Sequence, residues 1–228
     1  MIQLNVVNET SRLKAVVLGI AQSNGPTPTP AACYDPSSLM HVKAGTYPLE
    51  PQMLKELSAL EAVFKRYNVT VFRPHIIPDC NQIFARDVAF VIEDKIIKSN
   101  ILPDRENEFS AMSHILEQID SRKIIELPEE CHIEGGDVIL FNDYLFAGVY
   151  TGPDYSDFIT ARTNQKAIDA LKSLFPHKTL KTFELKKSNT EPQENALHLD
   201  CCFQPIGKGK ALIHKAGFLN PLDCQFLE

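Results

Sequence analysis

The sequence lacks the segments that direct a chain to a membrane or hold it there. Its first residues, MIQLNVVNETSRLK, do not place a basic start before an apolar core, as a secretory signal peptide would. No apolar run in the sequence reaches the roughly 20 residues that a membrane-spanning helix needs. We therefore expect a cytoplasmic protein without membrane contact.

The sequence also lacks paired cysteines and an excess of positive charge. Its six cysteines include no CxxC pair and no spacing typical of an extracellular disulfide framework, which predicts reduced thiols. Their spacing to His132 and His198 matches no common zinc motif, so we expect no metal site. The formal net charge of −6 gives no general attraction to nucleic acid.

The chain is long enough to bury a core. Its 228 residues fit one large domain or two small ones, and its 44% hydrophobic and 23% charged residues are ordinary for a globular protein. We interpret residues 1–228 as a single domain.

Hairpins, helices and strands recur in one order along the chain. Alternating apolar residues around short polar turns predict hairpins at 88–97, 138–149 and 201–214. Apolar residues at helical spacing predict helices at 51–67, 104–119 and 164–175. β-Branched runs predict strands at 12–19, 69–72, 123–127 and 179–185. The order hairpin, helix, strand thus repeats about every 50 to 65 residues, which predicts an α/β fold of related units.

Two segments carry more specific expectations. The helix at 51–67 should bury one face, formed by Met53, Leu57, Leu60, Phe64 and Tyr67. The segment 22–48 is long for a structureless connection, so we interpret it either as a flap over a central site or as a surface excursion.

Acidic residues occur in phase with the repeat. Asp87, Asp137 and Asp200 each sit one residue before the first strand of a predicted hairpin. If the units are related by rotation, equivalent positions converge on one axis, and acids from three remote segments meet there. In the stretch HIEGGDVIL, two glycines separate Glu134 from Asp137; a surface turn is the plain reading of that stretch taken alone.

Four motifs, in order, resemble those of a known superfamily. They are NETSRLKAVVLG near the start, FARD at 84–87, EGGD at 134–137 and HLD at 198–200. The sequence resembles the guanidine-modifying enzymes: arginine deiminases, dimethylarginine hydrolases and amidinotransferases. The resemblance implies a pentein-like α/β propeller of five ββαβ units around a pseudo-fivefold axis, with the active site at its centre.

The resemblance implies roles for the acids and the histidine. Asp87 and Glu134 would bind a guanidinium, whose planar fork of N–H groups matches carboxylates through charge-assisted hydrogen bonds. His198 would be the general acid and base, or else a packed histidine, and Asp200 would orient it or touch the substrate.

Three further residues could belong to the same site. Asp137 would fix the turn of the EGGD motif beside the substrate. Arg86 could bind a substrate carboxylate or cap a loop. Arg162 could reach the pocket rim or be a solvated helix end, and Thr163 is the expected N-cap of the helix that follows.

The nucleophile departs from the pattern of the superfamily. There, a cysteine in the fifth unit attacks the guanidinium carbon and forms a covalent amidino-cysteine. Here the fifth unit and its cysteine are expected to be missing, so we assign no cysteine to this role. We interpret the sequence as a C-terminally incomplete version of a longer chain; a shortened inactive relative and a complete short enzyme are the alternatives.

The sequence therefore predicts an amidinotransferase or a deiminase-type hydrolase acting on an arginine-like molecule. No cofactor is implied. The alternative is a non-catalytic module of the same fold that binds an arginine-like ligand or a protein partner. An incomplete propeller would expose an unpaired seam, which favours homo-oligomers.

Overall fold

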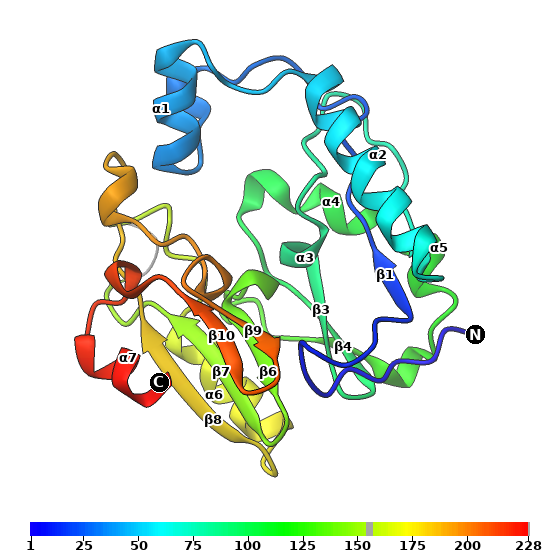
Figure 1. Cartoon of the computed structure of the whole chain (residues 1–228), viewed down its shortest axis with the longest axis vertical. Coiled ribbons are helices and arrows are strands. Elements are labelled where there is room, and N and C mark those ends of the chain that lie inside the picture. Colours follow the sequence, from blue (N-terminus) through cyan, green and yellow to red (C-terminus); the bar gives the residue numbers. More distant parts are fainter. Residues whose placement is uncertain (154–156, 228) are drawn as a thin grey trace.

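The computed structural model describes residues 1–153 and 157–227. Within these ranges the chain forms four small sheets with helices between and around them (Figure 1). No helix in these ranges combines the length and the apolar character that crossing a membrane requires.

The first unit consists of two strands joined by a helical segment. Strand β1 (Ala15–Val17) pairs in parallel with β2 (Thr70–Phe72), and α2 (Glu50–Arg66) connects them. Before α2, the chain forms a short 3-10 helix, η1 (Pro30–Ala32), and α1 (Pro36–Ala44). In Figure 1, α1 lies at the upper left and α2 at the upper right, with the chain running across the top of the molecule between them.

The second and third units each contain a hairpin, helical turns and a parallel third strand. The second unit runs through α3 (Ala85–Val88), β3 (Ala89–Ile92), β4 (Lys95–Lys98), η2 (Pro103–Arg105), α4 (Asn107–Ser110), α5 (Ser113–Leu116), η3 (Ser121–Lys123) and β5 (Ile124–Glu126). The third runs through η4 (Gly135–Asp137), β6 (Val138–Phe141), β7 (Tyr144–Val149), α6 (Gln165–Leu174) and β8 (Thr179–Glu184). Both sheets have the order antiparallel hairpin, then parallel strand.

The fourth unit begins in the same way. Its elements are η5 (Pro192–Glu194), η6 (Leu199–Cys201), β9 (Phe203–Gly207), β10 (Lys210–Ile213), η7 (Lys215–Gly217) and α7 (Pro221–Leu227). Strands β9 and β10 form an antiparallel hairpin. The predicted repeat of hairpin, helix and strand is therefore present, whereas a closed five-unit propeller stays a prediction.

Separate apolar clusters join neighbouring units to one another. One cluster packs Ile92 and Ile97 of the second unit against Leu140, Leu145 and residues of α6 from the third. Another packs residues of the third unit, including Phe183, against residues of the fourth. Burying this apolar surface holds successive units side by side and so fixes where their hairpins begin.

The prediction of one continuous helix at 104–119 is wrong. The structure breaks it into η2, α4 and α5, with Met112 between the last two at φ −94° and ψ 0°. The hydroxyl of Ser110 donates to the carbonyl of Asn107 (2.7 Å). A serine that bonds to its own helix in this way competes with the regular backbone pattern.

The predicted apolar face of α2 is covered only in part. Met53 is buried, but Leu60 and Tyr67 are 41% and 67% exposed. The sheet of the first unit has two strands in the structure. A sheet of this width is too narrow to cover an apolar face that runs the whole length of a 17-residue helix.

The segment 22–48 contains a helix rather than a plain loop. Asp35 caps α1 by accepting from the backbone N–H of Ser38 (2.9 Å), and Pro36 occupies the first turn. Gly45 ends α1 in the left-handed conformation, at φ 65°. These signals were readable in the sequence.

Three single-turn helices precede the hairpins and pack on one another. Asp87 lies in α3, Asp137 in η4 and Asp200 in η6. A Cβ at Gly135 would overlap the carbonyl oxygen of Arg86 in α3, and one at Gly136 would lie 2.7 Å from the ring of His198. The two glycines of EGGD therefore allow η4 to lie directly against its neighbours on both sides.

We predict that Gly135→Ala destabilises the fold. The added methyl group must push α3 away from η4, and over-packing of this kind costs at least about 2 kcal/mol. Thermal and chemical denaturation measure the loss. The control is Gly45→Asn, because no atom lies within 4 Å of a Cβ there and asparagine tolerates its left-handed backbone. Equal stability of the two variants would contradict the close approach of η4 and α3.

Candidate functional site

Side chains from three units meet in one buried cluster. Asp87, Glu134 and His198 each offer one polar atom, and these atoms lie within 4.8 Å of one another. Glu134 is fully buried, and His198 and Asp87 are 4% and 7% exposed. Residues far apart in the sequence are therefore neighbours at the place where the repeat predicted convergence.

The short helices before the hairpins position these three side chains. Asp87 lies within α3, whereas Glu134 and His198 are the extended residues that precede η4 and η6. Each of these helices stops after one turn. The side chains in or just before that turn therefore face the neighbouring unit. The same local shape thus delivers a polar side chain from each unit.

A charged hydrogen bond joins the histidine to the glutamate. Nε2 of His198 lies 2.8 Å from Oε2 of Glu134, and Nδ1 lies 3.8 Å from Oδ1 of Asp87. Burial lowers the pKa of His198, but its bond to Glu134 and the charge of Asp87 outweigh this and raise the pKa above its ordinary value of 6.5. The pair therefore favours the imidazolium–carboxylate form.

Arg162 holds the other side of Glu134. Its Nη1 donates to both carboxylate oxygens, at 2.9 and 3.0 Å, and its side chain is 2% exposed. Burial raises the pKa of Glu134, but its partners, His198 and Arg162 foremost, more than offset this and lower it to about 2. The interpretation of Arg162 as a solvated helix end is therefore wrong. Its side chain is buried because the buried carboxylate of Glu134 needs a counter-charge.

A second arginine enters the cluster from the second unit. Nη1 of Arg105 lies 3.1 Å from Oδ2 of Asp87 and 3.6 Å from Oε2 of Glu134. Its Nε and Nη2 donate to Glu108 at 2.7 and 3.2 Å. Arg105 therefore bridges three carboxylates.

Sequence reasoning missed Arg105 and Glu108, although the repeat held a signal for the arginine. Arg105 lies shortly before α4 and Arg162 shortly before α6, so each precedes the helix of its unit. The continuous helix predicted over 104–119 hid this equivalence.

Asp137 supports the cluster instead of joining it. Its Oδ2 accepts from the hydroxyl of Thr163 (2.7 Å) and its Oδ1 from the backbone N–H of Leu199 (3.0 Å). It therefore ties the third unit to the residue that follows His198. Thr163 is not the predicted N-cap of α6, since Asn164 takes that place by accepting from Ala167.

Arg86 and Asp200 contact each other at the edge of the cluster. Nε of Arg86 lies 3.4 Å from Oδ2 of Asp200, and its Nη2 donates to the carbonyl of Val138 (2.7 Å) and lies 3.6 Å from Glu9. Burial raises the pKa of Asp200 although His198 and Arg86 oppose it. Arg86 thus joins α3, β6 and η6, and its side-chain partners are Val138, Glu9 and Asp200 rather than Glu134 or His198.

The two cysteines next to Asp200 carry un-ionised thiols at neutral pH. Sγ of Cys201 lies 3.7 Å from Oδ1 of Asp200, and burial together with that negative charge raises its pKa to about 11. Burial and the neighbouring Cys201 raise the pKa of Cys202 to about 12. A thiol must be ionised to attack, so neither position has the environment of an activated nucleophile.

The three converging donors could be taken for metal ligands, but their partners argue otherwise. Both oxygens of Glu134 already accept from Arg162, and Arg105 lies 3.1 Å from Asp87. Two guanidinium groups at this distance would repel a divalent ion and compete for the lone pairs that it needs. The carboxylates are thus already paired with cations that bind them through N–H groups, those of Arg105 and Arg162.

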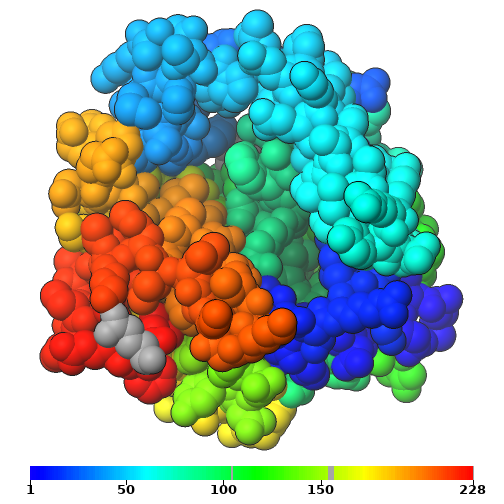
Figure 2. Space-filling model, viewed as in Figure 1, coloured from blue at the N-terminus to red at the C-terminus, as the bar shows by residue number. Residues whose placement is uncertain are grey.

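The segment that contains α1 reaches the cluster. Nη2 of Arg162 donates to the backbone carbonyl of Tyr34 (3.1 Å), which lies just before α1. In the space-filling view of Figure 2, the face of the molecule is hollowed between the blue and cyan segment of α1 and α2 and the green and orange parts of the chain. The contact supports the interpretation of residues 22–48 as a flap.

Similar folds are found among enzymes that act on guanidine groups. SxtG, an amidinotransferase from Microseira wollei in saxitoxin biosynthesis, matches 95% of this chain and 71% of its own, at a TM-score of 0.70 and 18% identity. A dimethylarginine dimethylaminohydrolase matches 89% of this chain and 69% of its own, at a TM-score of 0.63 and 15% identity. These likenesses establish a mixed α/β fold of the pentein type.

Sequence comparison gives the family. An uncharacterized protein of Bacillus subtilis, YkgA, is 31% identical over 136 residues, which are 58% of this chain but only 40% of that relative. The family model described as arginine deiminase matches residues 28–219. The chain therefore belongs to the arginine deiminase family.

Proposed function

We propose that the cluster of Asp87, Glu134 and His198 binds the guanidinium group of an arginine-like molecule and takes part in its modification. The observation that carries the proposal is the convergence of these side chains, from three units, within 4.8 Å in a buried site. Carboxylates placed in this way match the N–H fork of a planar cation.

The charge balance of the cluster favours a cationic ligand once His198 has lost its proton. Asp87, Glu108 and Glu134 face two permanent positive charges, those of Arg105 and Arg162. When His198 is neutral, one negative charge is left without a counter-ion. A guanidinium that enters from solvent supplies the missing charge and lowers the cost of keeping three carboxylates buried.

His198 is placed to move protons at the bound group. Its Nε2 is held by Glu134 and its Nδ1 faces Asp87 at 3.8 Å, so the imidazolium can donate a proton to a leaving amine. The neutral ring that remains can then activate water or an amine. Water would make the reaction a hydrolysis, and an amine would make it an amidino transfer.

The covalent step of the superfamily needs a thiolate, and we assign it to none of the cysteines that the structure describes. This favours a second candidate function, binding of an arginine-like ligand without chemistry, and the observation behind it is the raised thiol pKa of Cys201 and Cys202. The two functions share the guanidinium site and differ in whether a covalent intermediate forms.

We predict that Asp87→Asn weakens binding of arginine and of methylguanidinium roughly tenfold to a hundredfold. The substitution removes a charge-assisted hydrogen bond worth about 1.5–3 kcal/mol, and every 1.4 kcal/mol is tenfold. Isothermal titration calorimetry measures the affinity. Asp94→Asn is the control. It changes the net charge by the same amount, but at a side chain that is 53% exposed in a hairpin turn. Equal affinities of Asp87→Asn and wild type would remove Asp87 from the site.

The affinity for methylguanidinium should rise with pH in two steps. The lower step comes from Asp200 and Glu108: burial raises their pKa values, so they ionise above the ordinary carboxyl range and then add negative charge. The upper step comes from His198: its pKa is raised, and losing its proton removes a cation that repels the ligand. Titrations between pH 5 and 9 test this, and His198→Gln should abolish the upper step alone. An affinity that falls as pH rises would contradict the charge balance.

Incubation with arginine should leave the six cysteines of this chain unmodified. Their reactivity is tested by intact-mass spectrometry, which detects an added amidino group. As a control, iodoacetamide should label Cys201 faster as pH approaches 11, because its side chain reaches solvent although the surrounding protein desolvates the thiol and raises its pKa. An adduct on Cys201 or Cys202 would identify the nucleophile and rule out the binding-only function.

A further inference from the structure

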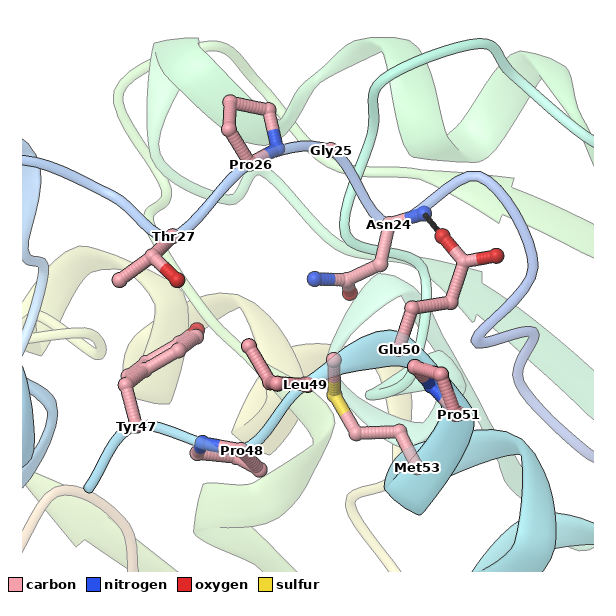
Figure 3. Close-up of a pocket in the computed structure, with 10 residues that line it drawn as sticks. All are labelled: Asn24, Gly25, Pro26, Thr27, Tyr47, Pro48, Leu49, Glu50, Pro51 and Met53. Atoms are coloured by element: carbon pink, nitrogen blue, oxygen red, sulfur yellow. Dashed lines mark hydrogen bonds between the residues drawn. The ribbon is translucent and has the colours of Figure 1, made fainter. Parts of the chain in front are cut away.

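A pocket outside the acidic cluster lies where the flap joins the first unit. It has a volume of about 300 Å³ and is lined by residues 24–27 and by residues 47–51 and Met53 at the start of α2. Figure 3 shows the two segments facing each other across it. None of its lining residues belongs to the cluster around Glu134, so the guanidinium site does not account for it.

Asn24 is buried in this pocket with an unsatisfied oxygen. The residue is 7% exposed, and its Oδ1 has no hydrogen-bond partner within the described part of the chain. The backbone N–H of Asn24 donates to Oε2 of Glu50 (3.1 Å). Native proteins contain few such groups, because a buried polar atom without a partner is destabilising.

The carboxamide of Asn24 faces other polar groups across the pocket. In Figure 3, its side chain points into the space toward the hydroxyl of Thr27 and the phenol of Tyr47. Burial, with the negative charge of Asp35, raises the pKa of Tyr47, so its phenol stays neutral and can donate. Apolar walls complete the pocket, formed by Pro26, Pro48, Leu49, Pro51 and Met53.

The start of α2 is not free to hold an anion. The side chain of Gln52 accepts from the backbone N–H of Leu49 (2.9 Å), which satisfies one of the donors at this helix end. Glu50 adds a negative charge in the first turn. The carboxylate of Glu50 in turn accepts from the backbone of Asn24, away from the space that the carboxamide faces in Figure 3. The groups that line this space are therefore mainly neutral.

We propose that this pocket binds a small neutral molecule that carries a carboxamide or urea-type group on a compact apolar body. An asparagine side chain pairs with such a group through two hydrogen bonds: Oδ1 accepts from the ligand N–H, and Nδ2 donates to the ligand carbonyl. Thr27 and Tyr47 offer further hydroxyl groups, and the proline, leucine and methionine walls receive the apolar part.

Three probes of similar shape test the chemical class. Isobutyramide carries the amide, isobutylamine an ammonium group and isobutyrate a carboxylate. We expect saturable shifts of the Asn24 side-chain amide signals in ¹⁵N nuclear magnetic resonance titrations of the full chain with isobutyramide. The amine and the acid should bind at least about tenfold more weakly. Tighter binding of either charged probe, or no saturable shift with the amide, would overturn the proposal.

Substitution of Asn24 separates a ligand group from a structural one. Asn24→Leu should remove the binding of isobutyramide while leaving the melting temperature equal to or above that of wild type, because Oδ1 has no partner to lose. The control is Asn100→Leu, which should lower the melting temperature, since Nδ2 of Asn100 donates to the carbonyls of Pro128 and Cys131 at 2.8 and 3.0 Å. A melting temperature that falls as much in Asn24→Leu as in the control would show that Asn24 is structural.

This test is independent of the guanidinium site. Asn24→Leu leaves Asp87, Glu134 and His198 in place, so methylguanidinium should bind to the variant as it does to wild type. A loss of methylguanidinium binding together with that of isobutyramide would mean that the pocket is part of the guanidinium site, which would overturn the proposal of a separate one.

Discussion

The fully buried carboxylate of Glu134 is the constraint on which the rest of the site depends. A charge removed from water is stable only among partners, and three units supply them here. His198 approaches from the fourth unit at 2.8 Å, Arg162 from the third at 2.9 Å and Arg105 from the second at 3.6 Å. The requirement to neutralise one group thus fixes how three units sit relative to one another.

Equivalent positions of the repeat serve different purposes around this charge. Asp87 faces the cluster, Asp137 bonds to the backbone of Leu199, and Asp200 lies against Arg86 at the edge. The repeat therefore supplies an acid at each hairpin mouth, and the surroundings decide its task. Close packing of the single-turn helices, which the glycines of EGGD permit, makes such division possible within a few ångströms.

Much of the arrangement could be predicted from the sequence, and the failures have physical causes. The phase of the motifs predicted that Asp87, Asp137 and Asp200 meet, because a repeat in sequence implies a repeat in space. The structure groups Asp87 with Glu134 and His198, the residues that the family resemblance pointed to. The burial of Arg162 could not be predicted from the sequence, because whether a charged side chain is buried depends on a partner from elsewhere in the chain. The same holds for Leu60 and Tyr67 of α2, whose exposure reflects the width of the sheet beneath them rather than their own spacing. The predicted continuous helix hid Arg105, and its break between α4 and α5 follows Ser110, which bonds to its own helix.

The acidic cluster and the Asn24 pocket differ in whether their buried polar groups have partners, and the segment 22–48 contacts both. In the acidic cluster nearly every charge has a counter-charge, whereas Asn24 keeps an oxygen without a partner. The chain between the two walls of the Asn24 pocket carries the carbonyl of Tyr34, to which Arg162 donates. Arg162 also holds both oxygens of Glu134, so the first unit contacts the acidic cluster through the residue that neutralises its buried carboxylate.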